Sequence, residues 1–127
     1  YAELFSLYAG ARAVVVPLKS DISYPSGLRA MLEGMLLERP VIVTRTRILE
    51  EYASDAEVQF VRPGDVSDLR NAIGGVVSAD WSSLSPKLER AKRRVEDQYN
   101  LSRFGEDMAC ILRDIEGRAS PDTAQQP

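Results

Sequence analysis

Histidine is absent from this 127-residue sequence, and cysteine occurs once, at Cys110. Without imidazole the chain has no Ser-His pair, no histidine general base and none of the commonest nitrogen ligands of metal ions. A lone cysteine cannot form a disulfide within the chain, which is typical of proteins from a reducing compartment. We therefore expect a cytoplasmic protein in which Cys110 is a small buried side chain on a helix.

Long apolar runs and a large excess of one charge are also missing. No hydrophobic stretch approaches the roughly 20 residues that a transmembrane segment needs. The 16 Lys and Arg residues against 19 Asp and Glu give a formal net charge of -3, which provides no overall field to attract nucleic acid or an acidic membrane. We expect neither nucleic acid nor a membrane as a partner.

The sequence starts at Tyr1 and reads immediately as helix interior, without the basic and apolar regions of a signal peptide. We therefore expect that it begins inside a longer protein. Its length suits a single hydrophobic core.

Short β-branched apolar runs alternate with helical patterns along most of the chain. We predict strands at 13–18, 40–44 and 58–61, and helices at 2–10, 27–38, 48–53 and 66–77. Because parallel strands need a crossover of this length, the pattern predicts an α/β fold with a Rossmann-like parallel sheet flanked by helices. We expect residues 1–100 to form this incomplete Rossmann-like domain.

Apolar spacing defines the helix faces that should cover the sheet, with Ser26 a suitable N-cap for the helix that follows it. The predicted faces are Leu28, Met31, Leu32, Met35 and Leu36 in one helix, and Val66, Leu69, Ile73 and Val76 in another. A loop around Trp81 precedes two further helices that meet at Asn100-Leu101. The second of these occupies 101–117, and we expect the polar residues 118–127 to be a disordered tail.

Basic residues follow each predicted strand, at the sheet edge where open α/β folds bind ligands. They are Lys19, Arg45, Arg47 and Arg62. Together they predict a local positive field, which Asp21, Glu50 and Glu51 dilute. Alternatively, these cations are ordinary solvated surface residues.

A loop enters a helix through Gly27, where the missing Cβ lets the backbone approach a ligand closely. The amides near Gly27 and Leu28 suit a phosphate because the first helical turn has unpaired N–H groups. Glu33 lies about 9 Å further along the axis, where its carboxylate could accept two ribose hydroxyls. Alternatively, Glu33 is a solvated surface residue.

The runs AVVVPL, SGLRAMLEGMLLERPVIVT and VRPGDVSDLRNAI resemble the C-terminal domain of GT-B glycosyltransferases. The similarity is to the large retaining glycosyltransferase family four, the glycosyl transferases group 1 type, and extends over roughly residues 1–112. Its most specific elements are the Gly27-Leu28 turn leading to Leu32-Glu33, Pro40-Val41, and the Pro63-Gly64-Asp65 turn.

This resemblance implies that the full protein is a hexosyltransferase-type enzyme that moves a sugar from a nucleotide diphosphate donor to an acceptor hydroxyl with retention. The donor site would include Lys19, Ser26, Gly27, Leu28, Glu33 and Arg45. The 101–117 helix would pack back on an N-terminal domain absent from this sequence. Neither a metal nor another cofactor is expected, because helix amides and cations stabilise the leaving pyrophosphate. Residues 1–127 alone should be inactive.

The family carries two acids spaced E-x7-E, and Glu33 matches the second. The first falls on Pro25 or, with a one-residue shift, on Tyr24, so neither position is acidic. Asp21 is the nearest acid and a candidate contact for the transferred sugar.

Two further departures are Gly34, where the family has alanine, and Glu38, where it prefers glycine. Two other functions stay open on this pattern. One is a degenerate glycosyltransferase-like domain that serves as a non-catalytic interaction module. The other is a GT-B-like nucleotide-sugar epimerase.

Overall fold

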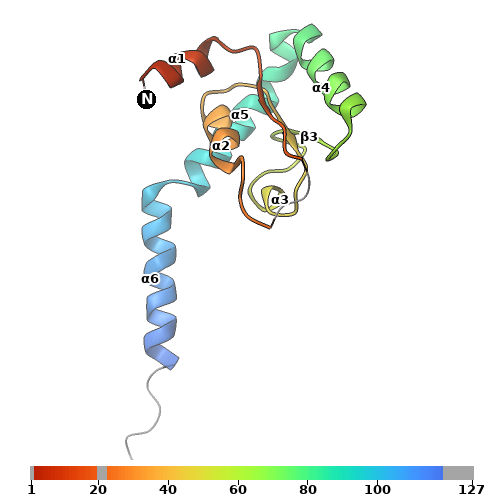
Figure 1. The fold of residues 1–127 in the computed structure, drawn as a ribbon. Coiled ribbons are helices and arrows are strands. Elements are labelled where there is room, and N and C mark those ends of the chain that lie inside the picture. The colour runs from red at the N-terminus through yellow and green to blue at the C-terminus, as the bar shows by residue number, and fades with distance from the viewer. Residues whose placement is uncertain (1, 20–22, 119–127) are drawn as a thin grey trace, which may run out of the picture. The chain divides into compact units, whose positions relative to one another are not determined.

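The computed structural model describes residues 2–19 and 23–118 (Figure 1). The chain separates into two compact units, Tyr1–Glu96 and Asp97–Pro127. The first unit holds the sheet and five helices, and the second holds the last helix.

A three-stranded parallel sheet forms the centre of the first unit. Its strands are β1 (Val14–Val16), β2 (Val41–Thr44) and β3 (Gln59–Val61), in the order β1-β2-β3. Val14 pairs with Val41, and Ile42 pairs with Gln59. All four residues of β2 are buried, as expected for the middle strand of a sheet that is covered on both faces. The predicted parallel sheet is confirmed, with each strand shorter than the sequence pattern indicated.

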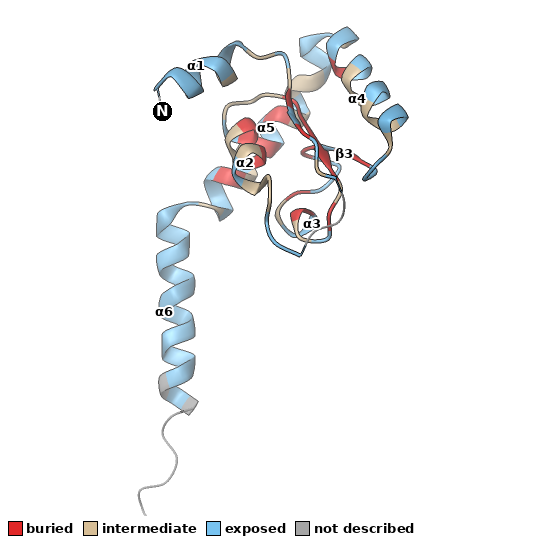
Figure 2. Ribbon diagram, in the orientation of Figure 1, coloured by how far each residue is buried: buried red, intermediate tan, exposed pale blue. Residues whose placement is uncertain are grey.

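Helices cover both faces of this sheet (Figure 1). Helix α2 (Leu28–Leu36) packs on β1 and β2, whereas α4 (Val66–Ser78) packs on β2 and β3. The fully buried side chains of Met31 and Met35 anchor α2. On the α4 side, Ile42, Val61 and Val76 form a buried cluster with the half-buried Leu69, Ile73 and Leu84 around it. Figure 2 shows the buried residues concentrated on the strands and on the sides of the helices that face them.

Gly34 is the point at which α2 comes closest to the sheet. A Cβ on Gly34 would lie 2.7 Å from Val41 Cγ2 and 3.2 Å from Val14 Cγ2. Such contacts are too short for ordinary packing, so the alanine of the family pattern would displace valine side chains from β1 or β2. The short distance between α2 and the sheet therefore explains why glycine occupies position 34, although glycine lowers helix propensity by about 1 kcal/mol.

The C-terminus of α2 ends in a Schellman motif. The amide of Glu38 donates to the Met35 carbonyl (3.1 Å), and the amide of Arg39 donates to the Gly34 carbonyl (2.9 Å). Glu38 itself has φ 52°, the left-handed conformation that glycine adopts most easily. A salt bridge from Lys92 Nζ to Glu38 Oε2 (3.1 Å) connects this turn to α5 (Trp81–Gln98).

Helices α1 (Ala2–Gly10), α3 (Leu49–Tyr52) and α5 (Trp81–Gln98) complete the first unit. The predicted loop around Trp81 is wrong, because Trp81 is the first residue of α5. Two guanidinium groups approach its ring, with Arg12 Cζ and Arg39 Cζ at 5.6 and 5.0 Å from the ring centre. Favourable contact of cations with the indole face holds the start of α5 against the segments that lead into β1 and β2.

Val66 is not part of the core face predicted for α4. Its exposed fraction is 69%, because it is the first residue of the helix and lies at the rim of the sheet, where no strand covers it. Leu36, at the other end of the predicted α2 face, is also exposed. Terminal positions of both helices therefore extend beyond the sheet that buries their central turns.

The second unit consists of α6 (Leu101–Arg118) and its flanks. Asn100 caps this helix, since its Oδ1 accepts a hydrogen bond from the Arg103 amide (2.8 Å). The apolar side chains of α6 are exposed: Leu101, Phe104, Met108, Ile111, Leu112 and Ile115. Cys110 is exposed as well, so the expectation of a buried thiol is wrong, because within its own unit α6 packs on no apolar surface.

The predicted tail begins at residue 118, which the structure places in α6. Residues 119–127 lie outside the described part of the chain. None of the described helices combines the length and the apolar composition needed to cross a membrane.

Candidate functional site

The start of α2 lies directly against the carboxyl end of β1. Gly27 is the N-cap residue, with φ 77°, and no side chain in the described structure caps this helix. A Cβ on Gly27 would lie 2.6 Å from Val16 Cγ1. Backbone conformation and space therefore both require glycine at this position.

Ser26 is not the N-cap, contrary to the sequence prediction, because Gly27 takes that place. Its amide instead donates to the Tyr24 carbonyl (2.7 Å), and the Leu28 amide donates to the Pro25 carbonyl at the longer distance of 3.3 Å. The turn before α2 is thus held by its own backbone. This leaves the helix N-terminus without a carboxylate or hydroxyl from its own cap residue, which favours an external anion there.

Glu33 lies on the side of α2 that faces away from the sheet and next to α1. Its carboxylate is half-buried, with 17% of the side chain exposed, and Arg29 Nε lies 2.8 Å from its Oε1. Burial raises the pKa of Tyr8, on α1, and the neighbouring Glu33 carboxylate raises it further, whereas the charge of Arg29 lowers it. Tyr8 therefore stays protonated at neutral pH.

Arg45, the basic residue after β2, is engaged with acidic neighbours. Its guanidinium binds both oxygens of Asp55 at 2.9 Å and also contacts Glu50. The same group lies 4.7 Å from the ring centre of Phe60. The bonds to Asp55 and Glu50 raise the pKa of Arg45, so it remains charged while its field is largely offset.

Arg62, after β3, is paired in the same way, with Asp65 at 2.9 Å and Asp68 at 3.3 Å. A hydrogen bond from the Arg62 amide lowers the pKa of Asp68 despite an opposing effect of burial, and the Arg62 side chain adds to the lowering. Lys19 and Arg47 are exposed. Two of the four cations expected to create a positive edge are thus bound to carboxylates, which weakens the field at the ends of β2 and β3.

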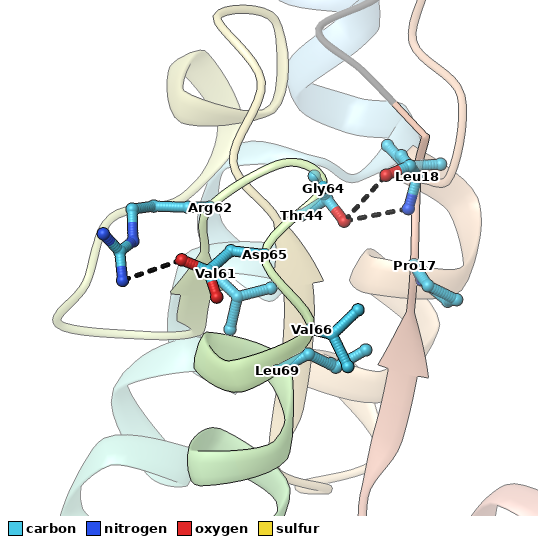
Figure 3. Close-up of a pocket in the computed structure, with 9 residues that line it drawn as sticks. All are labelled: Pro17, Leu18, Thr44, Val61, Arg62, Gly64, Asp65, Val66 and Leu69. Carbon is cyan, nitrogen blue, oxygen red and sulfur yellow. Dashed lines mark hydrogen bonds and ion pairs between the residues drawn. The ribbon is translucent and has the colours of Figure 1, made fainter.

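A small pocket opens at the carboxyl ends of the three strands, beside the start of α4 (Figure 3). Its volume is about 150 Å³, and it is lined by Pro17, Leu18, Thr44, Val61, Arg62, Gly64, Asp65, Val66 and Leu69. Ligand pockets usually have volumes of roughly 300–1,000 Å³. The pocket is therefore too small to enclose a nucleotide sugar by itself.

Thr44 closes the gap between the ends of β1 and β2. Its hydroxyl accepts a hydrogen bond from the Leu18 amide (2.8 Å) and donates to the Leu18 carbonyl (3.3 Å). These bonds fix the first residues after β1, which lead toward Lys19 and the loop before α2. At the start of α4, Asp65 is the N-cap, and its side chain accepts a hydrogen bond from the Asp68 amide (2.8 Å).

Sequence reasoning missed Thr44 as a part of this edge. The N-cap role of Asp65 was readable, since aspartate before a helix is a common cap. Asp21, the candidate sugar contact, lies outside the described residues. Among the residues that are described, no cluster of three or more His, Cys, Asp or Glu side chains could hold a metal ion.

Comparison with known proteins bears on the fold. The sequence matches no family model and no curated protein. Among solved structures, the chain is similar to sucrose-phosphate synthase from Thermosynechococcus elongatus, with a TM-score of 0.72 and 24% sequence identity over 92% of this chain. The fold is that of the C-terminal, Rossmann-like half of a GT-B enzyme. This chain covers 29% of the synthase, less than a third of its length.

Proposed function

We propose that this chain supplies the nucleotide-sugar-binding part of a retaining glycosyltransferase of hexosyltransferase type. The observation that carries the proposal is the start of α2: a glycine N-cap with φ 77°, without a capping side chain, packed against the end of β1 in a parallel sheet. A helix N-terminus at this edge is a ready site for phosphate. Similarity in fold to sucrose-phosphate synthase supports the same assignment.

In this proposal the distal phosphate of the donor accepts from the Gly27 amide and from the Leu28 amide, which exchanges its 3.3 Å bond to the Pro25 carbonyl for a phosphate oxygen. Glu33 accepts the ribose hydroxyls. Ser26 and Lys19 lie on the approach to the helix. Arg45 joins the site by exchanging Asp55 or Glu50 for a phosphate oxygen, because it is bound to both carboxylates. Charge on the leaving pyrophosphate is stabilised by these groups without a metal.

An N-terminal domain of the same protein would provide the acceptor site, and the exposed apolar face of α6 would pack on it. Pro25, in place of the first acid of the family pattern, favours the second candidate function, a non-catalytic glycosyltransferase-like module. We propose that residues 1–127 alone transfer no sugar, and efficient transfer by this segment would contradict that statement.

Titration of the full-length protein with UDP, ADP and GDP tests the donor site. A ligand present at 100 times its dissociation constant should stabilise the protein by about 2.7 kcal/mol. Glu33→Ala should weaken the nucleoside diphosphate that binds by about tenfold, because a charged hydrogen-bond acceptor is lost. Glu89→Ala, an exposed glutamate on α5, is the matched control and should leave affinity unchanged.

Two outcomes contradict the proposal. Absence of binding by all three diphosphates favours the non-catalytic module. Equal affinity in Glu33→Ala and the unsubstituted protein would refute the ribose assignment. Product analysis with a bound nucleotide sugar separates transfer from epimerisation, since only transfer joins the sugar to an acceptor hydroxyl.

A further inference from the structure

A single hydroxyl extends the contact between β1 and β2 beyond the last pair of their ladder. That ladder ends with Val16 opposite Val43, and Pro17, the next residue, has no N–H group to continue it. Thr44 Oγ1 accepts a hydrogen bond from the Leu18 amide at 2.8 Å and donates one to the Leu18 carbonyl at 3.3 Å (Figure 3). Both backbone groups of Leu18 are therefore held by one buried side chain of β2.

Leu18 lies next to the start of α2. A Cβ on Gly27 would be 3.7 Å from Leu18 Cδ2 and 3.9 Å from Leu18 Cδ1, and it would be 2.6 Å from Val16 Cγ1. The backbone at the N-cap of α2 thus rests on the side chains of Val16 and Leu18. The contacts lead from Thr44 on β2, through Leu18, to the first turn of α2.

We propose that Thr44 is a positioning residue that holds the first turn of α2, through Leu18, in the place where its amides receive the distal phosphate of the donor. This inference rests on the proposed function, because that function puts the distal phosphate at this turn. Hydrogen-bond donors that are fixed before the ligand arrives lose less conformational entropy on binding. Without the hydroxyl, Leu18 is free to move, and Gly27 loses one of the two side chains that support its backbone.

The test compares ligands with and without the distal phosphate in the full-length protein. Whichever of UDP, ADP or GDP binds is titrated beside its monophosphate. Thr44→Val should weaken the diphosphate about threefold to tenfold, the effect expected for one hydrogen bond. The monophosphate should change by less than about twofold, because it lacks the phosphate that the first turn receives. Thr44→Ser keeps the hydroxyl and should bind the diphosphate to within about twofold of the unsubstituted protein.

Thr46 provides a matched control, because it is the same residue type two positions later and is equally buried. Its side chain is 2% exposed, and its hydroxyl accepts a hydrogen bond from the Leu49 amide at 3.2 Å, which belongs to α3. Thr46→Val therefore also removes a buried hydroxyl and should destabilise the fold. It should leave the ratio of diphosphate to monophosphate affinity unchanged. Equal changes of this ratio in Thr44→Val and Thr46→Val would refute positioning in favour of general damage to the fold.

Hydrogen exchange of the unsubstituted protein tests the same contact without a substitution, so a Thr44→Val variant that does not fold still leaves the proposal decidable. Coupling between two sites is reciprocal, so a bond that strengthens diphosphate binding must itself open less often when the diphosphate is bound. Exchange of the Leu18 amide should be about threefold to tenfold slower with the diphosphate than with the monophosphate, at equal ratios of concentration to dissociation constant. Exchange of the Leu49 amide should not differ between the two ligands.

Failure of the inference and failure of the proposed function give different results. Suppose that the diphosphate binds more tightly than the monophosphate. An unchanged affinity ratio in folded Thr44→Val, or equal exchange of the Leu18 amide with both ligands, then refutes positioning while the phosphate site stands. If the unsubstituted protein binds no nucleoside diphosphate, or binds it no better than the monophosphate, both ideas are overturned. Unfolding midpoints of each variant, measured in parallel, show that the comparison is made on folded protein.

Discussion

The hydroxyl of Thr44 is bonded to both the amide and the carbonyl of Leu18, 26 residues earlier in the sequence. Because Thr44 is 4% exposed, water cannot easily replace these bonds. Thr44→Val keeps the shape of the side chain and leaves two backbone groups of Leu18 without their partner. We expect a loss of about 1–3 kcal/mol of unfolding free energy, measured by urea denaturation. Thr44→Ser keeps the hydroxyl and should lose less, so equal losses would contradict the assigned bonds.

Gly27 and Gly64 test how much of the requirement for glycine is conformational and how much is steric. Both have positive φ, 77° and 73°. A Cβ at Gly27 would overlap with Val16, whereas a Cβ at Gly64 would have no atom within 4 Å. Gly64→Ala should cost about 1–2 kcal/mol from the left-handed conformation alone. Gly27→Ala should cost about 1–3 kcal/mol more through overlap. Similar unfolding free energies for the two variants would show that the start of α2 can move away from β1.

The order of elements was predictable because each burial pattern is local. A β-branched run such as Val14–Val16 indicates a buried strand, and the spacing of Met31 and Met35 indicates the buried face of a helix. Both patterns can be recognised from residues that are close in sequence. The N-cap of α2 was misplaced by one residue. Serine is a good cap, and the spacing of apolar residues does not indicate that Gly27 has a positive φ. Trp81 was placed in a loop because the serines around it weaken the helical signal.

The interactions that shape the candidate site were mostly beyond sequence reasoning. Glu33 could be singled out by spacing and resemblance, but Tyr8, whose pKa it raises, lies on another helix and comes near it only after folding. Arg45 was correctly placed after a strand, although no local pattern indicates that Asp55 binds it. From the sequence, Gly34 only weakens a helix. The structure shows that Val41 lies too close to leave room for a Cβ at this position. Pairwise contacts across elements depend on the packing of the whole unit.

Glu38 places two opposing effects at one position. Its left-handed backbone costs a residue with a Cβ about 1–2 kcal/mol, whereas its salt bridge with Lys92 is open to solvent and contributes less. The backbone term is larger, so we expect Glu38→Gly to stabilise the protein by about 0.5–1 kcal/mol. Glu38→Ala loses the salt bridge and keeps the strain, and it should be no more stable than the original. A less stable glycine variant would mean that the ion pair outweighs the strain.

Acid should destabilise the fold partly through Glu57. Burial opposes ionisation of this carboxyl, but hydrogen bonds from Ser54 and the charges of Arg94 and Arg90 outweigh it and lower the pKa. A carboxyl whose pKa is lower in the folded state contributes stability at pH values above its unfolded pKa, about 4.3, and loses that contribution as the pH falls through the folded pKa. Unfolding free energy measured from neutral pH to about pH 3 should therefore fall less steeply in Glu57→Gln. An unchanged slope would place the acid sensitivity in other carboxylates.

The exposed thiol of Cys110 makes the molecule easy to label at a single place. It is the chain's one cysteine, and Trp81 is its one tryptophan, and the two belong to different compact units. A dye attached at the thiol would accept excitation energy from a lone indole donor. One emission spectrum, recorded with and without a nucleotide, then reports whether the two units change their separation during binding.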